Sequence, residues 1–228
     1  MKVFEYTNKG SREENQDYVV HGSLSEESCA FVVADGMGGY SEGAMASKVV
    51  GDALLDFIEF NYTSFEPAIL LKEAISFAND ALMLKRIALG VSKMGCVVTV
   101  LFITQGYAYL SGLGDSRIYM YRDGKEVYRT EDHSVINELA KIRSLVPSSY
   151  DKYASVVTKS IMGDVPVDVA PIRKVKIEKG DIFILCTDGL HKELDMTRVV
   201  DYNENKKDDF DSFAPRVSDN FSFIKIEV

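Results

Sequence analysis

Two rhythms of hydrophobic positions alternate along this chain. Runs dense in β-branched and aromatic residues predict strands at "KVFEYTNKG", "CAFVVAD", "CVVTVLFIT", "YAYLSGLGD", "RIYMYRDGKEVYR" and "FSFIKIEV". Two more strands are expected in "APIRKVKIEKGDIFILCTDG", around a turn near Lys179. The central runs predict an antiparallel meander with hairpin turns at Gln105-Gly106 and Asp123-Gly124.

The second rhythm is helical, with apolar residues at three- and four-residue spacing. It predicts a helix over residues 41–60 and another over 66–89, with Ser64 as the cap of the second and Pro67 in its first turn. A third helix is expected in "DHSVINELAKI", whereas the amphipathic run "DFDSFAPRVSDN" is interrupted by Pro215. Strands before, between and after paired helices indicate an α+β protein with two antiparallel sheets flanked by helices.

Length and composition are those of an ordinary soluble globular protein. The chain has 228 residues, 46% of them hydrophobic, which is enough for one substantial core. No linker, repeat or low-complexity stretch divides it, so we expect a single domain over residues 1–228. No apolar run approaches the roughly 18 residues of a membrane span. The N-terminal stretch "MKVFEYTNKGSREENQD" also lacks the apolar core of a signal peptide.

Charge and cysteine usage narrow the class of protein further. A formal net charge of −9 argues against a nucleic-acid binder, because phosphate contacts need clustered Lys and Arg. The same acidity would follow if several aspartates converge on metal ions. Cys29, Cys96 and Cys186 each lie in an apolar run, and their odd number predicts reduced, buried thiols in a cytoplasmic protein.

Five aspartates lie at the mouths of predicted strands or in the loops that feed them. They are Asp17, Asp35, Asp115, Asp188 and Asp219. Any one of them alone would be interpreted as a turn former, since Asp-Gly and Asp-Asn favour turns. Together they suggest a site, and the absence of nearby His or Cys pairs favours hard cations such as magnesium or manganese over zinc.

The run "VVADGMGGYSEG" strengthens this interpretation. Here Asp35 ends an apolar strand, and four glycines follow within eight residues, which suits a backbone that approaches a ligand closely. Two ions about 3.5–4 Å apart can clamp a phosphoryl group and activate a water. Such a site also needs a guanidinium to hold the phosphate, and Arg12 is the candidate.

Six runs resemble the metal-dependent serine/threonine protein phosphatases, the PPM or type-2C family, and the bacterial branch in particular. They are "REENQD", "VVADGMGGYSEG", "GLGDSRIYMYRDG", "TEDHS", "GDIFILCTDGL" and "SDNFS". They occur in the order of the family and span nearly the whole chain. One run alone would be a weak signal, but six in order are not expected by chance.

The resemblance implies an αββα sandwich with a binuclear metal centre at one end, between the sheets. It implies that two Mn²⁺ or Mg²⁺ ions are bridged by Asp35, and that the backbone carbonyl of Gly36 binds one of them. The remaining protein ligands would be Asp17, Asp188 and Asp219.

The resemblance also implies the reaction. It is hydrolysis of phosphoserine and phosphothreonine in proteins by a metal-bridging hydroxide that attacks phosphorus in line, without a phosphoenzyme. Arg12 would hold the substrate phosphate. Asp35 and Arg12 are therefore the expected catalytic residues.

The chain departs from the family pattern at several positions. Met37 follows the Asp-Gly pair where eukaryotic relatives have a histidine, so no protein general acid is assigned. Some members bind a third ion with the aspartate at Asp115 and an acid shortly after "DGL". Here Lys192 stands where that acid is expected and Glu193 is the alternative, so the sequence leaves a third ion open.

Other segments have structural or recognition interpretations. Residues of about 141–158 fall where the family carries a flap-like loop that helps to choose substrates. We interpret the Gly95-Cys96 pair as packing, His133 as a structural hydrogen-bonding residue, and His191 as a surface residue at a helix start.

Two functions from different classes remain open. The first is an active signalling phosphatase, expected to be a cytoplasmic monomer whose partners are a phosphorylated protein and its cognate Ser/Thr kinase. The second is a catalytically silent relative that binds a phosphoprotein. The presence of Arg12 and all the expected ligands favours the enzyme. A two-metal nuclease shares the carboxylates but does not suit the acidic charge.

Overall fold

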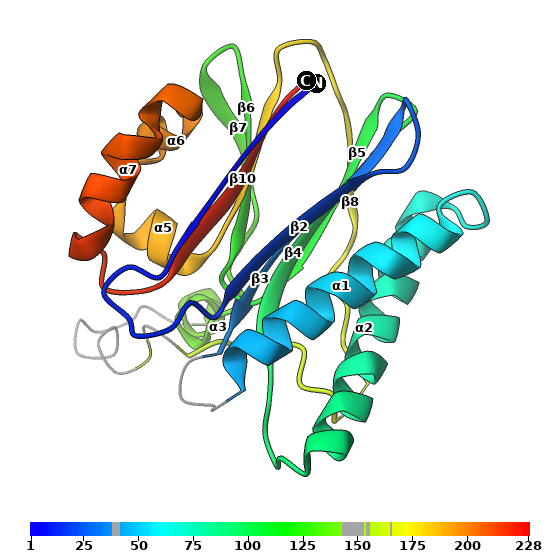
Figure 1. The fold of residues 1–228 in the computed structure, drawn as a ribbon. Coiled ribbons are helices and arrows are strands. Elements are labelled where there is room, and N and C mark those ends of the chain that lie inside the picture. The colour runs from blue at the N-terminus through cyan, green and yellow to red at the C-terminus, as the bar shows by residue number, and fades with distance from the viewer. Residues whose placement is uncertain (38–41, 143–152, 154–155, 165) are drawn as a thin grey trace.

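Two antiparallel sheets of five strands each form the middle of the protein, and helices cover both outer faces (Figure 1). The computed structural model describes residues 1–37, 42–142, 153, 156–164 and 166–228. This arrangement confirms the α+β sandwich expected from the sequence.

The first sheet has the strand order β1 (Lys2–Asn8), β10 (Phe221–Glu227), β9 (Ile182–Cys186), β6 (Arg117–Arg122), β7 (Lys125–Arg129). The second has the order β2 (Asp17–Ser23), β3 (Ser28–Gly36), β4 (Cys96–Thr104), β5 (Tyr107–Leu113), β8 (Arg173–Lys176). The chain ends lie together because β1 pairs with β10, as Figure 1 shows.

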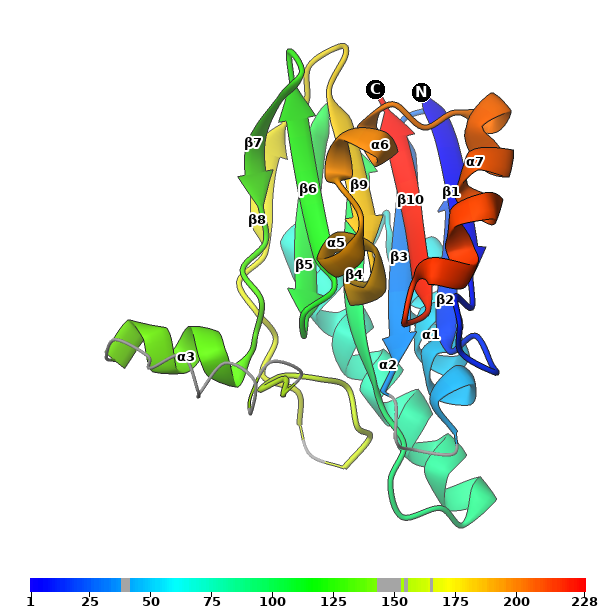
Figure 2. The ribbon, with the colours of Figure 1, turned by 90° about the vertical axis from the view of Figure 1, so that its left-hand side faces the viewer.

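Helices form the two outer layers. The second sheet is covered by α1 (Gly43–Asn61) and α2 (Pro67–Leu89). The first sheet is covered by α5 (Asp188–Glu193), α6 (Met196–Val200), α7 (Lys207–Phe213) and the short 3₁₀ turns η1 (Glu204–Lys206) and η2 (Ala214–Arg216). The helix α3 (Val135–Ile142) projects from one end of the sandwich (Figure 2).

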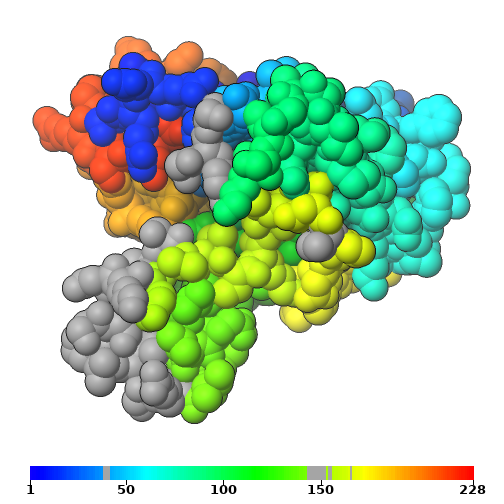
Figure 3. Space-filling model, turned by 90° about the horizontal axis from the view of Figure 1, so that it is seen from below, coloured from blue at the N-terminus to red at the C-terminus, as the bar shows by residue number. Residues whose placement is uncertain are grey.

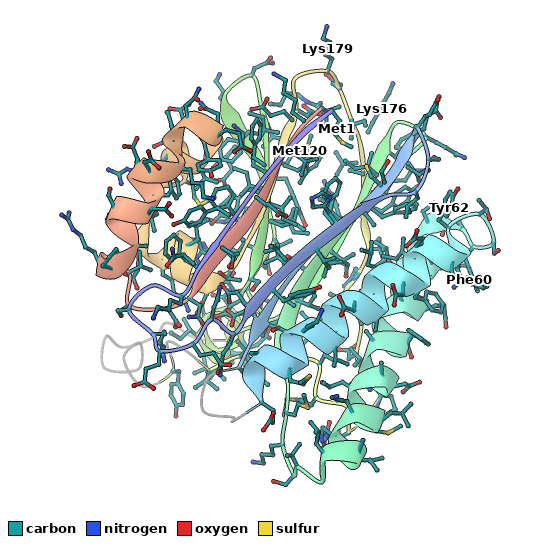
Figure 4. All side chains as sticks on the ribbon, in the orientation of Figure 1. Met1, Phe60, Tyr62, Met120, Lys176 and Lys179 are labelled. Atoms are coloured by element: carbon teal, nitrogen blue, oxygen red, sulfur yellow. The ribbon has the colours of Figure 1, made fainter. Side chains whose placement is uncertain are left out.

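Three apolar layers hold the sandwich together. Phe31 and Val33 of β3 lie in the core between the sheets, whereas their neighbours Ala30 and Val32 pack toward α1 and α2. Burial of both faces explains why β3 is apolar without interruption. Side chains fill the space between the sheets, where the labelled Met120 lies (Figure 4). The third layer, under α5 to α7, is rich in aromatic rings.

The expected central meander is wrong, although its strands and turns are present. Gln105 and Asp123 both have φ of 50° and precede glycines with positive φ, as the two hairpin turns require. However, the β4–β5 hairpin belongs to the second sheet and the β6–β7 hairpin to the first. The chain crosses between the sheets after Gly114, whose φ is 109°. The strands β8 and β9 are divided between the sheets in the same way.

The second helix begins where the sequence predicts, but a different residue caps it. The second helix starts at Pro67 as expected, but Glu66 caps it rather than Ser64. The Glu66 carboxylate accepts hydrogen bonds from the backbone N–H groups of Ala68 and Ile69. Glutamate is not among the preferred capping residues, so the composition pointed to the serine.

The three cysteines are buried free thiols, as expected. Gly95 and Cys96 have a packing role: a Cβ at Gly95 would lie 2.3 Å from the Met162 sulfur. The flap-like loop expected over about 141–158 lies largely outside the described residues. Within the described part of the chain, no helix combines the length and apolarity needed to span a bilayer.

Candidate metal centre

The strand ends that carry the predicted site residues meet at one end of the sandwich, away from the chain ends. Antiparallel pairing of β2 with β3 places Asp17 opposite Asp35. A pocket of about 610 Å³ opens there, at the end that faces the viewer in Figure 3. Its lining includes six predicted residues: Arg12, Asp35, Gly36, Asp115, Asp188 and Asp219.

Asp17 lies buried beside this pocket and links the two sheets. Its Oδ2 accepts a hydrogen bond of 2.9 Å from the Thr187 hydroxyl and one of 2.7 Å from the Ser222 hydroxyl, both on the side of the first sheet. Its Oδ1 is buried and has no partner among the described residues. Burial raises the pKa of Asp17 to about 7, although the two hydroxyl groups oppose the shift.

Asp35 is even more strongly affected by its surroundings. Desolvation, followed by the charges of Asp17, Asp188 and Asp115, raises its pKa well above the ordinary value. A carboxylate whose neighbours are other carboxylates favours the ionised form only when a cation is close. Asp17 and Asp35 together therefore favour the binding of a cation.

Gly36 is required for a reason that the sequence did not show. A Cβ at this position would lie 2.3 Å from the Gly43 carbonyl oxygen and 2.8 Å from that of Gln16. The Gln16 carbonyl accepts hydrogen bonds from the Gly36 N–H at 3.0 Å and from the Ser47 hydroxyl at 2.6 Å. Three backbone segments thus converge behind Asp35, and only glycine leaves room for them.

Arg12 stands at the rim of the pocket, with its side chain 53% exposed. Its Nη2 donates to Asp219 Oδ2 at 2.9 Å, and its Nε donates to the Ser218 carbonyl at 3.2 Å. The other oxygen of Asp219 accepts from the N–H of Asn220. The guanidinium is consequently held in place beside the carboxylates before any substrate arrives.

Asn220 organises this rim, which the sequence analysis missed. Its Oδ1 accepts from the Gln16 N–H at 2.8 Å, and its Nδ2 donates to the carbonyls of Lys9 and Glu14. One amide side chain thereby holds the loop that carries Arg12 and leads to Asp17. The signal was present in the "SDNFS" run, where an amide follows the predicted ligand.

Asp115 is held by contacts to its backbone and its neighbours. His191 Nε2 lies 2.9 Å from the Asp115 carbonyl, so this nitrogen carries the proton that it donates. His133 receives a hydrogen bond from Gly114 and donates one to it through the backbone. His133 therefore has a structural role. His191 is not the surface residue at a helix start that we expected. It lies within α5, is half-buried, and contacts the loop of Asp115.

The arginine after Asp115 is fixed by the "TEDHS" run. Arg117 forms a two-point ion pair with Asp132, with both N–O distances at 2.7 Å. Burial, followed by repulsion from Arg117, lowers the pKa of His191 to about 4. A pKa this low favours the neutral ring at pH 7, with its proton on the Nε2 that donates to the Asp115 carbonyl.

Lys192 and Glu193 have different surroundings. Lys192 Nζ lies 2.6 Å from Asp188 Oδ2 and 3.1 Å from Asp115 Oδ2. Glu193 instead accepts hydrogen bonds from the backbone N–H and the hydroxyl of Ser218. The spacing of Lys192 four residues after Asp188 on a helix was the available signal for this ion pair.

The residues present fit a centre for hard cations. The unpartnered Asp17 oxygen and the mutually repelling carboxylates both call for positive charge. As the side chains of the described residues stand, no three His, Cys, Asp or Glu groups enclose a metal position. Asp219 is paired with Arg12 and Asp188 with Lys192. Metal binding would therefore exchange part of these ion pairs for metal contacts.

A second pocket, of about 500 Å³, lies among α6, α7 and the segments beside them. Charged side chains of both signs line it, including Arg198, Lys206, Asp201 and Asp209. It contains none of the converging carboxylates described above. Of the two pockets, the one at Asp35 is therefore the candidate metal centre.

Comparison with known proteins agrees with this geometry. A family model described as protein phosphatase 2C matches residues 7–222. A relative named protein phosphatase PhpP, from Streptococcus pneumoniae, is 30% identical over 198 residues, which cover 83% of this chain and 78% of that relative.

Solved structures show the same fold. The S. agalactiae serine/threonine phosphatase superposes with a TM-score of 0.82 at 25% identity, covering 100% of this chain and 99% of that one. The catalytic domain of the serine/threonine protein phosphatase PstP, in complex with two manganese ions, gives a TM-score of 0.79 at 22% identity, covering 98% and 96%. This chain belongs to the protein phosphatase 2C family.

Proposed function

We propose that the chain hydrolyses phosphoserine and phosphothreonine in proteins. Two manganese or magnesium ions would be held by Asp17, Asp35, the Gly36 carbonyl, Asp188 and Asp219. The observation that carries the proposal is the meeting of carboxylates from both sheets at one pocket, around a buried Asp17 oxygen without a partner in the described structure. Relatives named serine/threonine phosphatases, one of them a complex with two manganese ions, support it.

The chain's own residues have distinct roles in this proposal. Bound ions would supply Lewis acidity toward the phosphoryl oxygens and lower the pKa of a water. Asp35, at the end of β3, would bridge them. Thr187 and Ser222 orient Asp17 so that one oxygen is held and the other is left for a cation. Because the pKa values of Asp17 and Asp35 are raised, metal binding would displace protons.

Arg12 is the residue proposed to bind the substrate phosphate. Its Nε and Nη2 are engaged with Ser218 and Asp219, which fixes the plane of the guanidinium. Its Nη1 has no partner within the described ranges, and the side chain is half exposed at the pocket rim. A planar, pre-oriented fork of donors suits a phosphate dianion.

A protein general acid is not assigned. Met37 lines the pocket next to Gly36 and cannot transfer a proton. His191 is neutral and bound to the Asp115 carbonyl, and His133 is bound to Gly114. In this proposal the leaving alkoxide is protonated by solvent in the open pocket.

The test is phosphate release from a phosphothreonine peptide with manganese, with magnesium and with chelator. Release that requires a metal and is lost in Asp35→Asn supports the proposal. The control is Asp56→Asn, which removes an exposed carboxylate of α1 and should leave release intact. If folded protein binds manganese but releases no phosphate, the silent phosphoprotein-binding relative becomes the better account.

The remaining predictions about context stay predictions. They are a phosphoprotein substrate with its cognate Ser/Thr kinase, a monomeric state and a cytoplasmic location. Analytical ultracentrifugation of the full chain tests the monomer directly.

A further inference from the structure

A lysine ammonium lies among the carboxylates of the candidate centre. Lys192 Nζ is within 3.1 Å of Asp115 Oδ2 and 2.6 Å of Asp188 Oδ2. The side chains of Asp115 and Asp188 are only 10% and 20% exposed. Because these two carboxylates are largely shielded from water, their mutual repulsion is poorly screened, and the ammonium between them offsets it.

The surroundings of Asp115 leave its carboxylate to this single cation. The backbone contacts with His191 and His133 fix its loop, and Arg117 is committed to Asp132. Among the described residues, Lys192 is the one cationic group that reaches the Asp115 carboxylate. The loop is thus built to present Asp115 toward Lys192.

The same two carboxylates are a natural place for a further divalent ion. Such an ion would need oxygens from both at about 2.0–2.6 Å, in the space where the ammonium now makes its contacts. A bound ammonium and a bound divalent ion cannot share this position. Glu193, the other acid of this helix end, is engaged with Ser218 and leaves the position without a replacement carboxylate.

We propose that Lys192 is a positioning residue whose ammonium occupies the place where Asp115 and Asp188 would otherwise hold a third divalent ion, so that the chain binds two. The inference rests on the proposed function, because it concerns the same centre. The inference extends the proposed function, because it assigns the charge-balancing role of a third metal ion to a side chain of the protein. Lys192 sits one helical turn after Asp188, so its cation is tethered and does not depend on metal supply.

A second consequence concerns the two remaining ions. The ammonium already binds one oxygen of Asp188, and its charge repels a divalent ion on the other. Removing the charge should therefore tighten binding of the two ions, by about ten-fold or more at the effective dielectric of a partly buried site.

Manganese binding to the chelator-treated full chain, measured by equilibrium dialysis with metal analysis, tests the inference without any substrate. Wild-type protein should bind two ions per chain up to millimolar manganese. Lys192→Asp should bind a third, and the double variant Lys192→Asp with Asp115→Asn should lose it again. Lys179→Asp, the same charge change at an exposed turn far from the pocket (Figure 4), should bind two.

Lys192→Gln is the second variant, since it keeps a polar side chain of similar length if Lys192→Asp does not fold. It should bind a third ion, because it leaves the carboxylates of Asp115 and Asp188 without the ammonium, and it should bind the other two ions about ten-fold more tightly than wild type. Three ions in wild type, or unchanged stoichiometry in Lys192→Asp together with unchanged affinity in Lys192→Gln, would overturn the inference. Folded wild-type protein that binds no manganese would contradict the proposed function, and the inference with it.

Discussion

The carboxylates on the two sides of the candidate centre differ in whether a cationic side chain balances their charge. On the side of the second sheet, Asp17 and Asp35 face each other across β2 and β3, no cationic partner reaches them from the described residues, and their pKa values are raised. On the other side, Asp188 is paired with Lys192 and Asp219 with Arg12. The first side depends on metal for its charge balance, whereas the second is balanced in advance by the chain.

This difference explains how one pocket can hold so many acids in a stable fold. In the unbalanced pair, Asp17 starts β2 and Asp35 lies near the end of β3, so that the sheet holds both backbones in place. The balanced acids come from α5 and the segment before β10, where cationic side chains are within reach. We expect changes on the unbalanced side to have the larger effects on chemistry.

The largest effect is expected from Asp35→Asn. This change removes the proposed bridging charge but keeps the shape of the side chain, so kcat should fall by about a thousand-fold or more while the fold is retained. Phosphate release and far-UV circular dichroism measure the two outcomes. Retained turnover would mean that Asp35 does not bridge the ions.

Arg12→Ala should have the next largest effect, on the balanced side. Loss of a charged hydrogen-bonding group of about 1.5–3 kcal/mol should raise KM by about ten- to a hundred-fold. Steady-state kinetics with a phosphothreonine peptide measure it, and Arg12→Lys should recover part of the loss because charge remains without the fork. A fall in kcat at unchanged KM would contradict phosphate binding by Arg12.

A third prediction concerns pH and the metal-free protein. Between the ordinary carboxyl pKa and about 7, folded protein keeps a proton on Asp17 that the unfolded chain has released. Rising pH therefore favours unfolding over this range. In chelator, the Tm should fall from pH 5 to pH 8, and manganese should restore it.

Asp17→Asn provides the matched variant for this experiment. It should flatten the fall in Tm, which corresponds to about 2–4 °C for each kcal/mol of stability. A Tm that rises with pH in chelator would show that Asp17 is ionised without strain, and the contrast between the two sides would then fail.

The smallest effect is expected from Asp115→Asn. Asp115 faces Lys192, so its loss should change the affinity for two manganese ions by less than about five-fold, as for a partly exposed ion pair. Equilibrium dialysis measures the change. A loss of ten-fold or more would place Asp115 among the metal ligands and reduce the contrast.

The sequence predicted more of the site than of the topology. The ends of β3 and β9 could be located from the sequence because both are buried apolar strands. Asp35 is the last residue but one of β3, and Asp188 follows shortly after β9, so both carboxylates had to emerge at an edge of a sheet. The assignment of strands to sheets is different. The connection after Gly114 could return to the same sheet or cross to the other, and local periodicity is the same in both cases.

Supporting contacts were also beyond sequence reasoning. Asn220 holds the loop of Arg12 through bonds to residues more than 200 positions away along the chain. Lys192 was recognised from the sequence as a departure from the family pattern, but its contact with Asp115 depends on how α5 packs against the loop after β5. The close approach of the Gly43 and Gln16 backbone to Gly36 was not foreseen either, and the metal-binding role of the Gly36 carbonyl stays a prediction.

The most direct test of the account is the anomalous diffraction of manganese in a crystal of the loaded protein. We expect two manganese peaks in the Asp35 pocket, both in contact with Asp35 and shared among Asp17, Asp188 and Asp219. The Lys192 ammonium, rather than a third peak, should lie between Asp115 and Asp188. Manganese absent from this pocket, or bound elsewhere on the molecule, would contradict it.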